Sequence, residues 1–382
     1  MATTARIKVE EKNPVQALQG FLKGLLSDEA LGGIMVPVHL FGKGMPMPTL
    51  VTDPDQLSAA DPLAPAYPMN SAKLLSRLTR GQSGEKIAAV MRPCEIRAFV
   101  ELVKLNQGSL DSIIIVGMDC AGAYGNTDYL KVVGDNDPIN TTIDFLGQHG
   151  CTNETAVDGV DIASACRVCE HPAPANADII IGIAGADLHS SIPVSAASAR
   201  GEALLNSLGL PEEQSSNGRE KTLKEIIERR TAARDAMMEE TRALTGTLAG
   251  LSEYFSSCVN CYNCRVACPV CYCKECVFNT DVFEHKPWQF MGWAKRKGSL
   301  KLPTDTVFYH LTRMTHMSTA CVGCGQCSNA CPNDIPVMEL FRTVAAQTQQ
   351  GFDYLPGRSL NEPPPLSVFK EDEFQETVSH MA

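Results

Sequence analysis

Two cysteine runs with the same spacing constrain this chain more than any other feature of its sequence. The first run is Cys258-x-x-Cys261-x-x-Cys264-x-x-x-Cys268-Pro269, and the second is Cys321-x-x-Cys324-x-x-Cys327-x-x-x-Cys331-Pro332. In this spacing three thiolates bind one cubane iron–sulfur cluster, and the fourth, before proline, binds the other cluster of a pair. Zinc also binds C-x-x-C pairs but does not require the duplicated run. The sequence therefore predicts two 4Fe–4S clusters and a protein that transfers electrons.

The bulk composition fits a redox protein of two or three domains. The chain has 382 residues, 16 cysteines and a formal net charge of −11 at pH 7. Residues 1–14 form no secretory h-region, and apolar runs such as residues 113–118 are too short to span a bilayer. We expect a cytoplasmic protein that keeps its thiols reduced for metal. No basic patch interleaved with aromatic residues is present, so nucleic acid and anionic membranes are not expected partners.

Residues 1–215 have the pattern of an α/β domain. Short β-branched runs that end in turn residues cover 86–91, 112–117 and 178–183. A helical pattern over residues 95–105 lies between the first two runs. This alternation predicts parallel strands joined by crossover helices.

The second half of the chain is predicted to be mostly helical. Spaced apolar residues predict a linker helix over residues 216–255, packed between two domains, with an extended coiled coil as the alternative. The cysteine runs fall in a predicted α-helical domain over residues 256–350, where 52 residues separate Cys268 from Cys321. Residues 351–382 lack core periodicity, so we expect an extended tail that either lies on a partner or is disordered.

Four cysteines of the first half are associated with the ends of predicted strands. Cys94 follows the first strand, and Cys120 ends the second. The loop Cys166-x-x-Cys169 lies just before the third strand. Because the carboxyl ends of parallel strands meet at one edge of a sheet, these four thiolates could hold a third cubane cluster. Spacing alone leaves open the alternative that Cys94 and Cys120 are buried core residues.

Two parts of the chain resemble known families. The long helical spacer between the cysteine runs is similar to the α-helical ferredoxin modules of heterodisulfide reductase and succinate dehydrogenase electron-transfer subunits. The segments that carry the second resemblance are Arg92-Pro93-Cys94, Ile115-Val116-Gly117-Met118-Asp119-Cys120, and Cys166-x-x-Cys169 followed by Ala177-Asp178-Ile179-Ile180-Ile181-Gly182. They resemble the β-subunit family of deazaflavin-reducing hydrogenase and formate dehydrogenase, whose deazaflavin is coenzyme F420. This resemblance implies that Cys94, Cys120, Cys166 and Cys169 ligate a cluster beside a non-covalent FAD.

The same resemblance suggests where the flavin would bind. The turn that contains Asn70, Ser71 and Lys73 is similar to a flavin-contacting turn of that family. An ordinary surface charge is the alternative for Lys73. Gly182 and Gly185 could let the backbone approach the flavin ring, although a plain turn also uses glycine. Neither G-x-G-x-x-G nor a Walker A loop is present, which disfavours a Rossmann-type FAD or NAD site.

The chain departs from this family at two points. Glu170-His171-Pro172 follows the C-x-x-C loop, where the family has a short acidic–aromatic pair. The ferredoxin motifs follow the flavin region, whereas in the relatives they precede it or are absent. The domain partners and the electron acceptor could therefore differ.

Together these features predict the electron-transfer β subunit of a formate dehydrogenase or hydrogenase complex. Electrons would pass between a catalytic subunit and an external two-electron carrier through FAD and three 4Fe–4S clusters. The chain lacks ligand sets typical of molybdopterin or nickel–iron sites, so it is not expected to oxidise formate or hydrogen alone. The alternatives are a flavin-free iron–sulfur relay and a subunit associated with heterodisulfide reductase, although no adjacent Cys-Cys pair supports the latter. The sequence does not choose among deazaflavin, NAD(P) and ferredoxin as the carrier.

Four cysteines remain outside these predicted clusters. Cys151 stands alone, and Cys271-x-Cys273-x-x-Cys276 follows the first run directly. These three could bind a metal with a ligand from a partner, but without a fourth local ligand the spacing is a weak signal. The histidines near the clusters, expected to form local hydrogen bonds rather than to ligate iron, are His285, His310 and His316.

Overall fold

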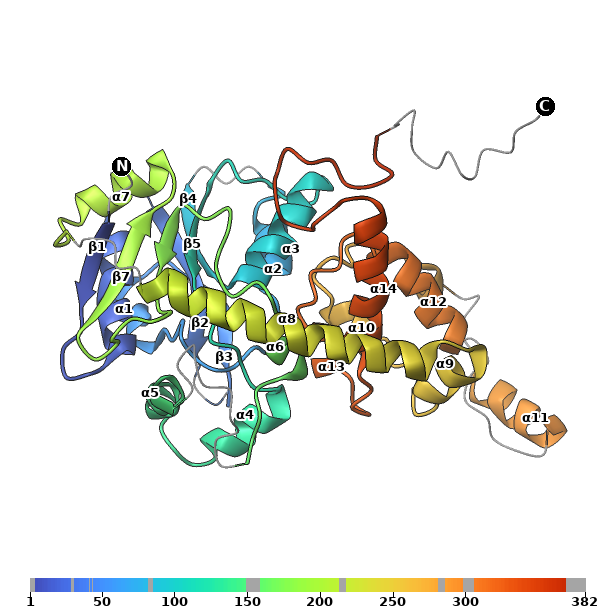
Figure 1. Cartoon of the computed structure of the whole chain (residues 1–382). Coiled ribbons are helices and arrows are strands. Elements are labelled where there is room, and N and C mark those ends of the chain that lie inside the picture. The colour runs from blue at the N-terminus through green and yellow to red at the C-terminus, as the bar shows by residue number, and fades with distance from the viewer. Residues whose placement is uncertain are drawn as a thin grey trace.

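The structure is a computed structural model. It describes residues 4–28, 31–40, 42, 44–81, 85–148, 159–212, 218–280, 286–297 and 306–368. An α/β region forms one end of the molecule and a group of helices forms the other (Figure 1).

The α/β region is built on a mixed sheet of seven strands in the order β1-β7-β6-β5-β4-β2-β3. The strands are β1 (Thr4–Lys8), β2 (Leu31–His39), β3 (Pro46–Val51), β4 (Lys86–Met91), β5 (Ile113–Met118), β6 (Ile179–Ile181) and β7 (Ser191–Ala196). The central strands β2, β4, β5 and β6 are parallel, as the sequence predicts. The edges are antiparallel, because β2–β3 and β6–β7 are joined by loops too short for a crossover.

Helices cover both faces of the sheet. They are α1 (Pro14–Leu26), α2 (Ala72–Leu78), α3 (Pro93–Lys104), α4 (Asn126–Val133), α5 (Pro138–Gln148), the single turn α6 (Ser164–Arg167) and α7 (Ala199–Ser207), with the 3-10 turn η1 (Pro54–Ala59). Alternate residues of β5 face different cores, as a strand requires. Ile114 and Val116 pack into a core shared with α1, and Ile113 and Ile115 pack into a core shared with α3.

The second core continues into the C-terminal helices. These are α9 (Leu248–Tyr254), α10 (Asn263–Ala267), α11 (Pro287–Lys297), α12 (Thr306–Met317), α13 (Gln326–Asn329) and α14 (Val337–Gly351), with the 3-10 turn η2 (Val277–Asn279). Phe99 and Ile115 of the α/β region share this core with Phe255, Met314 and Leu340. The helical region is therefore packed directly on one face of the sheet domain.

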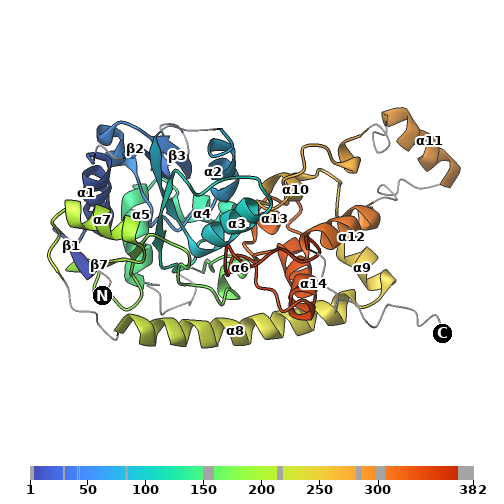
Figure 2. The same cartoon turned by 90° about the horizontal axis from the view of Figure 1, so that it is seen from above.

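Helix α8 (Gly218–Thr245) runs along one side of the molecule, from the sheet to the C-terminal helices (Figure 2). The helix predicted over residues 216–255 is interrupted after Thr245. Gly246 follows, and the Thr247 side chain accepts a hydrogen bond from the Gly250 N–H and so starts α9 as a separate helix. None of the described helices has the length and apolar character needed to cross a membrane.

The first part of the C-terminal tail contacts α3. Glu101, which is fully buried, accepts hydrogen bonds from the Tyr354 hydroxyl at 2.6 Å and the Gly357 N–H at 2.7 Å. Arg97 Nε donates to the Pro356 carbonyl at 2.9 Å. This part of the tail therefore lies on the chain's own α/β region.

Candidate functional site

The two cysteine runs fold in the same way. Each run leads into a short helix, α10 in the first and α13 in the second. Equivalent positions have positive φ: Asn260 (51°) matches Gly323 (68°), and Tyr262 (60°) matches Gly325 (78°). Left-handed residues at these two positions give both loops the same tight turn between their cysteines. The repeated spacing therefore reflects a repeated local structure.

Electrostatic interactions connect the two runs crosswise. Burial raises the pKa of Cys321 and Cys324, and the charge of Cys268 from the other run raises both further. Burial also raises the pKa of Cys258, and Cys331 of the second run adds to this increase. Cys268 therefore lies near cysteines of the second run and Cys331 near Cys258 of the first, which is the crossed arrangement that paired cubanes would require.

These groups are named by their position relative to the sheet. The outer set is Cys258, Cys261, Cys264 and Cys331, and the inner set is Cys268, Cys321, Cys324 and Cys327.

Four cysteines of the α/β region form a third group, the N-terminal set: Cys94, Cys120, Cys166 and Cys169. Cys94 begins α3 directly after β4, Cys120 follows β5, and Cys166 lies on α6. Burial raises the pKa of Cys166 to about 12, and charges on Cys120 and Cys169 contribute to the increase. The sheet edge thus gathers these four thiols, as the strand ends predict.

The N-terminal set adjoins the inner set. Burial raises the pKa of Cys94, and after Glu95 the largest charge effect comes from Cys324 of the inner set. The Tyr67 hydroxyl lies 3.4 Å from Cys94 Sγ, and the Tyr67 carbonyl accepts a hydrogen bond from Gln326 Nε2 at 2.8 Å. A Cβ on Gly325 would lie 2.4 Å from the Ala165 Cβ, beside Cys166. The three sets therefore follow one another in the order N-terminal, inner, outer.

The donor chemistry fits clusters better than single ions. Within the described ranges, no group of three or more His, Cys, Asp or Glu residues is arranged to hold one metal ion. A cubane binds each thiolate through a different iron atom, so its ligands stand farther apart than those of a single ion. Buried thiols whose pKa is raised are neutral alone, and the positive charge of iron would favour their thiolate form.

Helix α12 lies against the outer set. The Tyr309 hydroxyl is 3.5 Å from Cys264 Sγ, and His310 Nε2 is 3.4 Å from Cys258 Sγ. Arg313, which is buried, donates from Nη1 to Cys264 Sγ at 3.0 Å. The expected local hydrogen bonding of His310 is therefore observed, and its partner is a cysteine sulfur.

Glu170, where the chain departs from the family pattern, joins three elements. Its carboxylate pairs with Arg234 of α8 and Arg342 of α14. Burial alone would raise the pKa of Glu170, but Arg342 and His171, with a smaller contribution from Arg234, lower it to about 2. The pairing fixes the loop that carries Cys169 against both helices.

The structure does not bring the five predicted flavin contacts together. Asn70 is buried and donates to the Tyr67 hydroxyl at 2.7 Å, and the Ser71 N–H donates to Glu95 at 2.9 Å. Lys73 Nζ donates to the Val266 carbonyl at 2.9 Å, in the first cysteine run. Asn70 and Lys73 therefore link the α/β region to the cluster region.

The two glycines lie elsewhere, beside the start of α8. A Cβ on Gly182 would lie 3.1 Å from the Arg219 side chain. Gly185 has φ +69°, and its Cβ would lie 2.6 Å from Thr222 Oγ1. Position 185 therefore requires glycine for close packing of α8 against the sheet edge, whereas at Gly182 the Arg219 side chain would have to shift by only a few tenths of an ångström.

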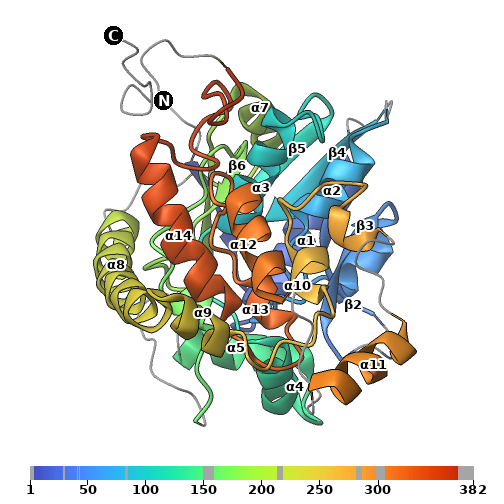
Figure 3. The same ribbon diagram turned by 90° about the vertical axis from the view of Figure 1, so that its right-hand side faces the viewer.

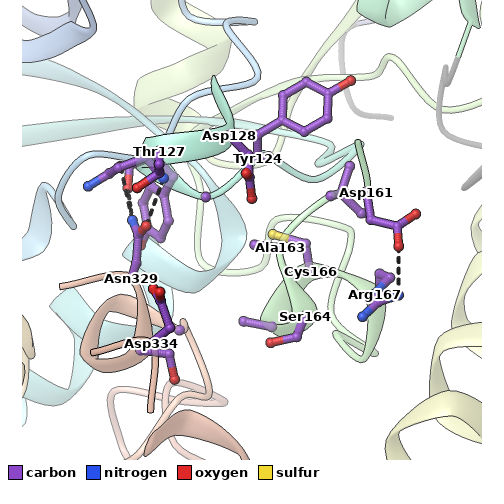
Figure 4. A pocket seen from close by; sticks show the side chains of 18 of the residues that line it. Tyr124, Thr127, Asp128, Asp161, Ala163, Ser164, Cys166, Arg167, Asn329 and Asp334 are labelled. Carbon is purple, nitrogen blue, oxygen red and sulfur yellow. Dashed lines mark hydrogen bonds and ion pairs between the residues drawn. The ribbon is translucent and has the colours of Figure 1, made fainter. Parts of the chain in front are cut away.

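A cavity of about 590 Å³ lies between α4, α6 and the second cysteine run (Figure 4). Cys166, Cys324 and Cys331, one from each set, contribute to its lining. Asn329 fixes the start of α4, since its Oδ1 accepts from the Asn126 N–H at 2.8 Å. None of the five predicted flavin contacts lines this cavity. Apart from these three cysteines, sequence reasoning did not identify the residues that line the cavity, because the lining combines α4 with segments distant in sequence.

The remaining cysteines differ in environment. Cys273 is exposed, whereas Cys271 and Cys276 are half-buried. Burial raises the pKa of Cys271 to about 11, and Cys268 of the inner set raises it as well. Cys276 packs near Phe278. Cys151 and His285 lie outside the described residues.

Comparisons with known proteins agree with this geometry. A family model described as a 4Fe-4S binding domain matches residues 314–337, which contain the second cysteine run. The chain is 27% identical to the F420-dependent formate dehydrogenase subunit beta of Methanocaldococcus jannaschii, covering 92% of this chain and 94% of that protein. It is 26% identical to the F420-dependent formate dehydrogenase 1 subunit beta of Methanococcus maripaludis, covering 87% and 89% respectively.

The chain also matches a solved structure, with lower sequence identity. It is that of the F420-reducing [NiFe] hydrogenase complex from Methanosarcina barkeri in a xenon derivative. The match has 16% identity and a TM-score of 0.44, and covers 65% of this chain and 94% of the other.

The fold and the cysteine sites together are those of an iron–sulfur protein that transfers electrons. Over most of its length the chain is similar to the beta subunits of F420-dependent formate dehydrogenases, and a 4Fe–4S domain occupies its C-terminal part. The resemblance stated from the N-terminal segments is thereby confirmed.

Proposed function

We propose that this chain is the electron-transfer β subunit of a formate dehydrogenase-type complex, with a hydrogenase-type complex as the alternative. The single observation that supports this best is the close approach of the cysteine-bearing segments of the two regions: the Tyr67 hydroxyl lies 3.4 Å from Cys94 Sγ, and the Tyr67 carbonyl accepts a hydrogen bond from Gln326 Nε2 at 2.8 Å. Three cubane clusters bound there would form one path for electrons. The similarity to two formate dehydrogenase beta subunits supports the choice of complex.

The protein's residues would hold each cluster and tune it. The N-terminal set sits at the sheet edge, the inner set at the junction of the two regions, and the outer set against α12. Buried surroundings exclude water from the sulfur atoms, and hydrogen bonds to sulfur adjust their electron density. A catalytic subunit would carry out the oxidation of formate, which this chain is not proposed to perform alone.

FAD is proposed to occupy the cavity between α4, α6 and the second cysteine run. Its volume of about 590 Å³ lies within the roughly 300–1,000 Å³ of cofactor sites. Lys131 and Arg167 line the cavity, and each pairs there with a carboxylate that also lines it, Asp128 and Asp161 respectively. The phosphates of a dinucleotide bound there would take the place of these carboxylates as partners of the two cations. Bound there, FAD would supply the exchange between two-electron and one-electron chemistry. Because the two relatives are named F420-dependent, we propose a deazaflavin as the external carrier.

Replacing Cys166 with serine is expected to remove one cluster of three. Iron content should fall from about 12 to about 8 atoms per chain, since each cubane holds four iron atoms. The matched control is Cys273→Ser, because Cys273 is exposed and belongs to none of the three sets. Iron analysis and electron paramagnetic resonance of the reduced protein measure both variants. An unchanged iron content in Cys166→Ser would contradict the N-terminal cluster.

A further inference from the structure

Exposed apolar side chains occur on the segments of the first cysteine run and on the helices that follow it. Among the described residues, those between positions 259 and 311 with 41–68% of their surface exposed are Val259, Val266, Val277, Trp288, Met291, Phe308 and Leu311. Monomeric proteins rarely expose contiguous apolar surface without a function in binding. We call these seven residues the outer face. The elements α10, α11 and α12, which carry five of them, lie at the end of the molecule that Figure 3 turns toward the viewer.

Helix α12 explains why part of this face is exposed. Its inner side carries Tyr309 and Arg313, which contact the cysteines of the outer set. Phe308 and Leu311 are three residues apart, so they share its opposite side and remain in solvent. The Phe308 ring packs edge-on against Phe278 at 6.0 Å, which places it beside Val277. The face is therefore fixed to the cluster region by the same helix that supports the cluster.

Basic residues outnumber acidic ones on the same segments. The charged side chains described between positions 259 and 296 are Arg265, Lys274, Glu275, Lys286, Lys295 and Arg296. Five of the six are cations, although the whole chain carries a formal net charge of −11. The local charge is therefore positive where the charge of the whole chain is negative. This favours a partner whose contacting surface has an apolar centre and acidic residues around it.

The outer set is the end of the cluster series that reaches the surface. Cys261 is exposed, whereas Cys258 and Cys264 of the same set are buried and the four cysteines of the inner set are half-buried. The Tyr67 hydroxyl lies 3.4 Å from Cys94 Sγ and the Tyr67 carbonyl accepts from Gln326, so the inner set adjoins the N-terminal set. A partner that exchanges electrons with the outer set at its exposed edge, Cys261, would therefore contact the outer face.

We propose that the outer face is the docking site for the metal-bearing catalytic subunit, which exchanges electrons with the cluster of the outer set. The proposal rests on the proposed function and deepens it by assigning the partner to one surface. The contacting surface of the partner is apolar with an acidic rim and lies close to a redox centre of its own. Docking buries Phe308 and Leu311 and covers the exposed edge at Cys261.

The test is the double variant Phe308→Glu with Leu311→Glu. Both side chains are exposed, although the Phe308 ring contacts the buried Phe278, so the single variant Leu311→Glu is measured as well. The matched control is Ile227→Glu, an exposed apolar residue of α8 that lies outside the outer face. The probe is the formate dehydrogenase catalytic subunit from the same organism, loaded with its own cofactors. Dissociation constants and formate-driven reduction of the chain's clusters are measured under anaerobic conditions, with iron content confirming that each variant is loaded.

The double variant is expected to weaken binding at least about tenfold, since central apolar contacts dominate interface energies, while Ile227→Glu binds as the original chain does. Formate-driven reduction should slow in parallel, and raised salt should weaken binding of the original chain. Unchanged affinity and reduction in the double variant would overturn the docking proposal. If the double variant lost self-association of the chain and kept its affinity for the catalytic subunit, the docking proposal would also be overturned. The outer face would then bind a second copy of this chain. Failure of the original chain to bind or accept electrons would refute the proposed function itself.

Discussion

Replacing Arg313 with methionine is expected to lower the midpoint potential of the cluster bound by the outer set. Arg313 Nη1 donates to Cys264 Sγ at 3.0 Å, and its guanidinium lies over the Phe341 ring at 4.7 Å. A cation that donates to a cluster sulfur stabilises the reduced form, which carries more negative charge. A hydrogen bond to a charged group contributes roughly 1.5–3 kcal/mol. Loss of this whole energy from the reduced form would correspond to a shift of roughly 65–130 mV, since a tenfold ratio is about 59 mV for one electron.

The same charge also acts on the inner set. Burial lowers the pKa of Arg313, but Cys264 and Tyr309, followed by Cys268 and Cys327, raise it overall. The inner cluster should therefore shift in the same direction by a smaller amount. Redox titration followed by electron paramagnetic resonance measures both potentials.

Two milder variants test the same role in case Arg313→Met does not fold. Arg313→Lys keeps the charge and should shift the potential less, and Tyr309→Phe removes a hydroxyl 3.5 Å from Cys264 Sγ without changing charge. The N-terminal cluster should keep its potential in all three variants. An outer-set potential that is the same in Arg313→Met as in the original chain would contradict this role.

Replacing Asp119 with alanine is expected to reduce the stability of the α/β region. Asp119 is fully buried at the end of β5, and its carboxylate accepts hydrogen bonds from Arg219 at 2.8 and 2.5 Å and from the Ala184 N–H at 3.2 Å. Breaking a fully buried ion pair costs about 3–5 kcal/mol. Because Arg219 is partly exposed, we expect a smaller loss of about 2–3 kcal/mol in the free energy of unfolding.

Thermal unfolding of the cluster-loaded chain should show this as a melting temperature several degrees lower. The control is Glu10→Ala, which removes an ion pair with Lys8 whose side chains are both more than 70% exposed. Exposed pairs contribute about 0–1 kcal/mol, so this control should melt within about a degree of the original chain. Equal melting temperatures in the two variants would show that Asp119 does not anchor α8.

The repeated cysteine spacing predicted a repeated local structure, because the spacing of ligands in a loop follows directly from local geometry. The positive φ angles at Asn260 and Tyr262 repeat those at Gly323 and Gly325, so a shared spacing does correspond to a shared loop. The parallel centre of the sheet was likewise readable from apolar runs such as Ile113–Val116, which are buried on both faces.

Contacts between segments distant in sequence are harder to predict. The sequence predicts Lys73 as a flavin contact or a surface charge, and gives no sign that its amine donates to the Val266 carbonyl, 193 positions along the chain. The cavity combines α4, α6 and the second cysteine run, which no local motif unites. The contacts of Arg313 with Cys264 are equally non-local, since nothing in the spacing of the long insert shows which of its residues meet the cluster.

The central claim is that three clusters and one flavin lie in a single chain. Anaerobic expression followed by analysis of iron, acid-labile sulfide and extractable flavin tests it most directly. We predict about 12 iron and about 12 sulfide atoms with one FAD per chain, since three cubanes contain four of each. About 8 iron atoms without flavin would leave only the inner and outer clusters. It would contradict both the N-terminal cluster and the flavin proposed for the cavity beside it.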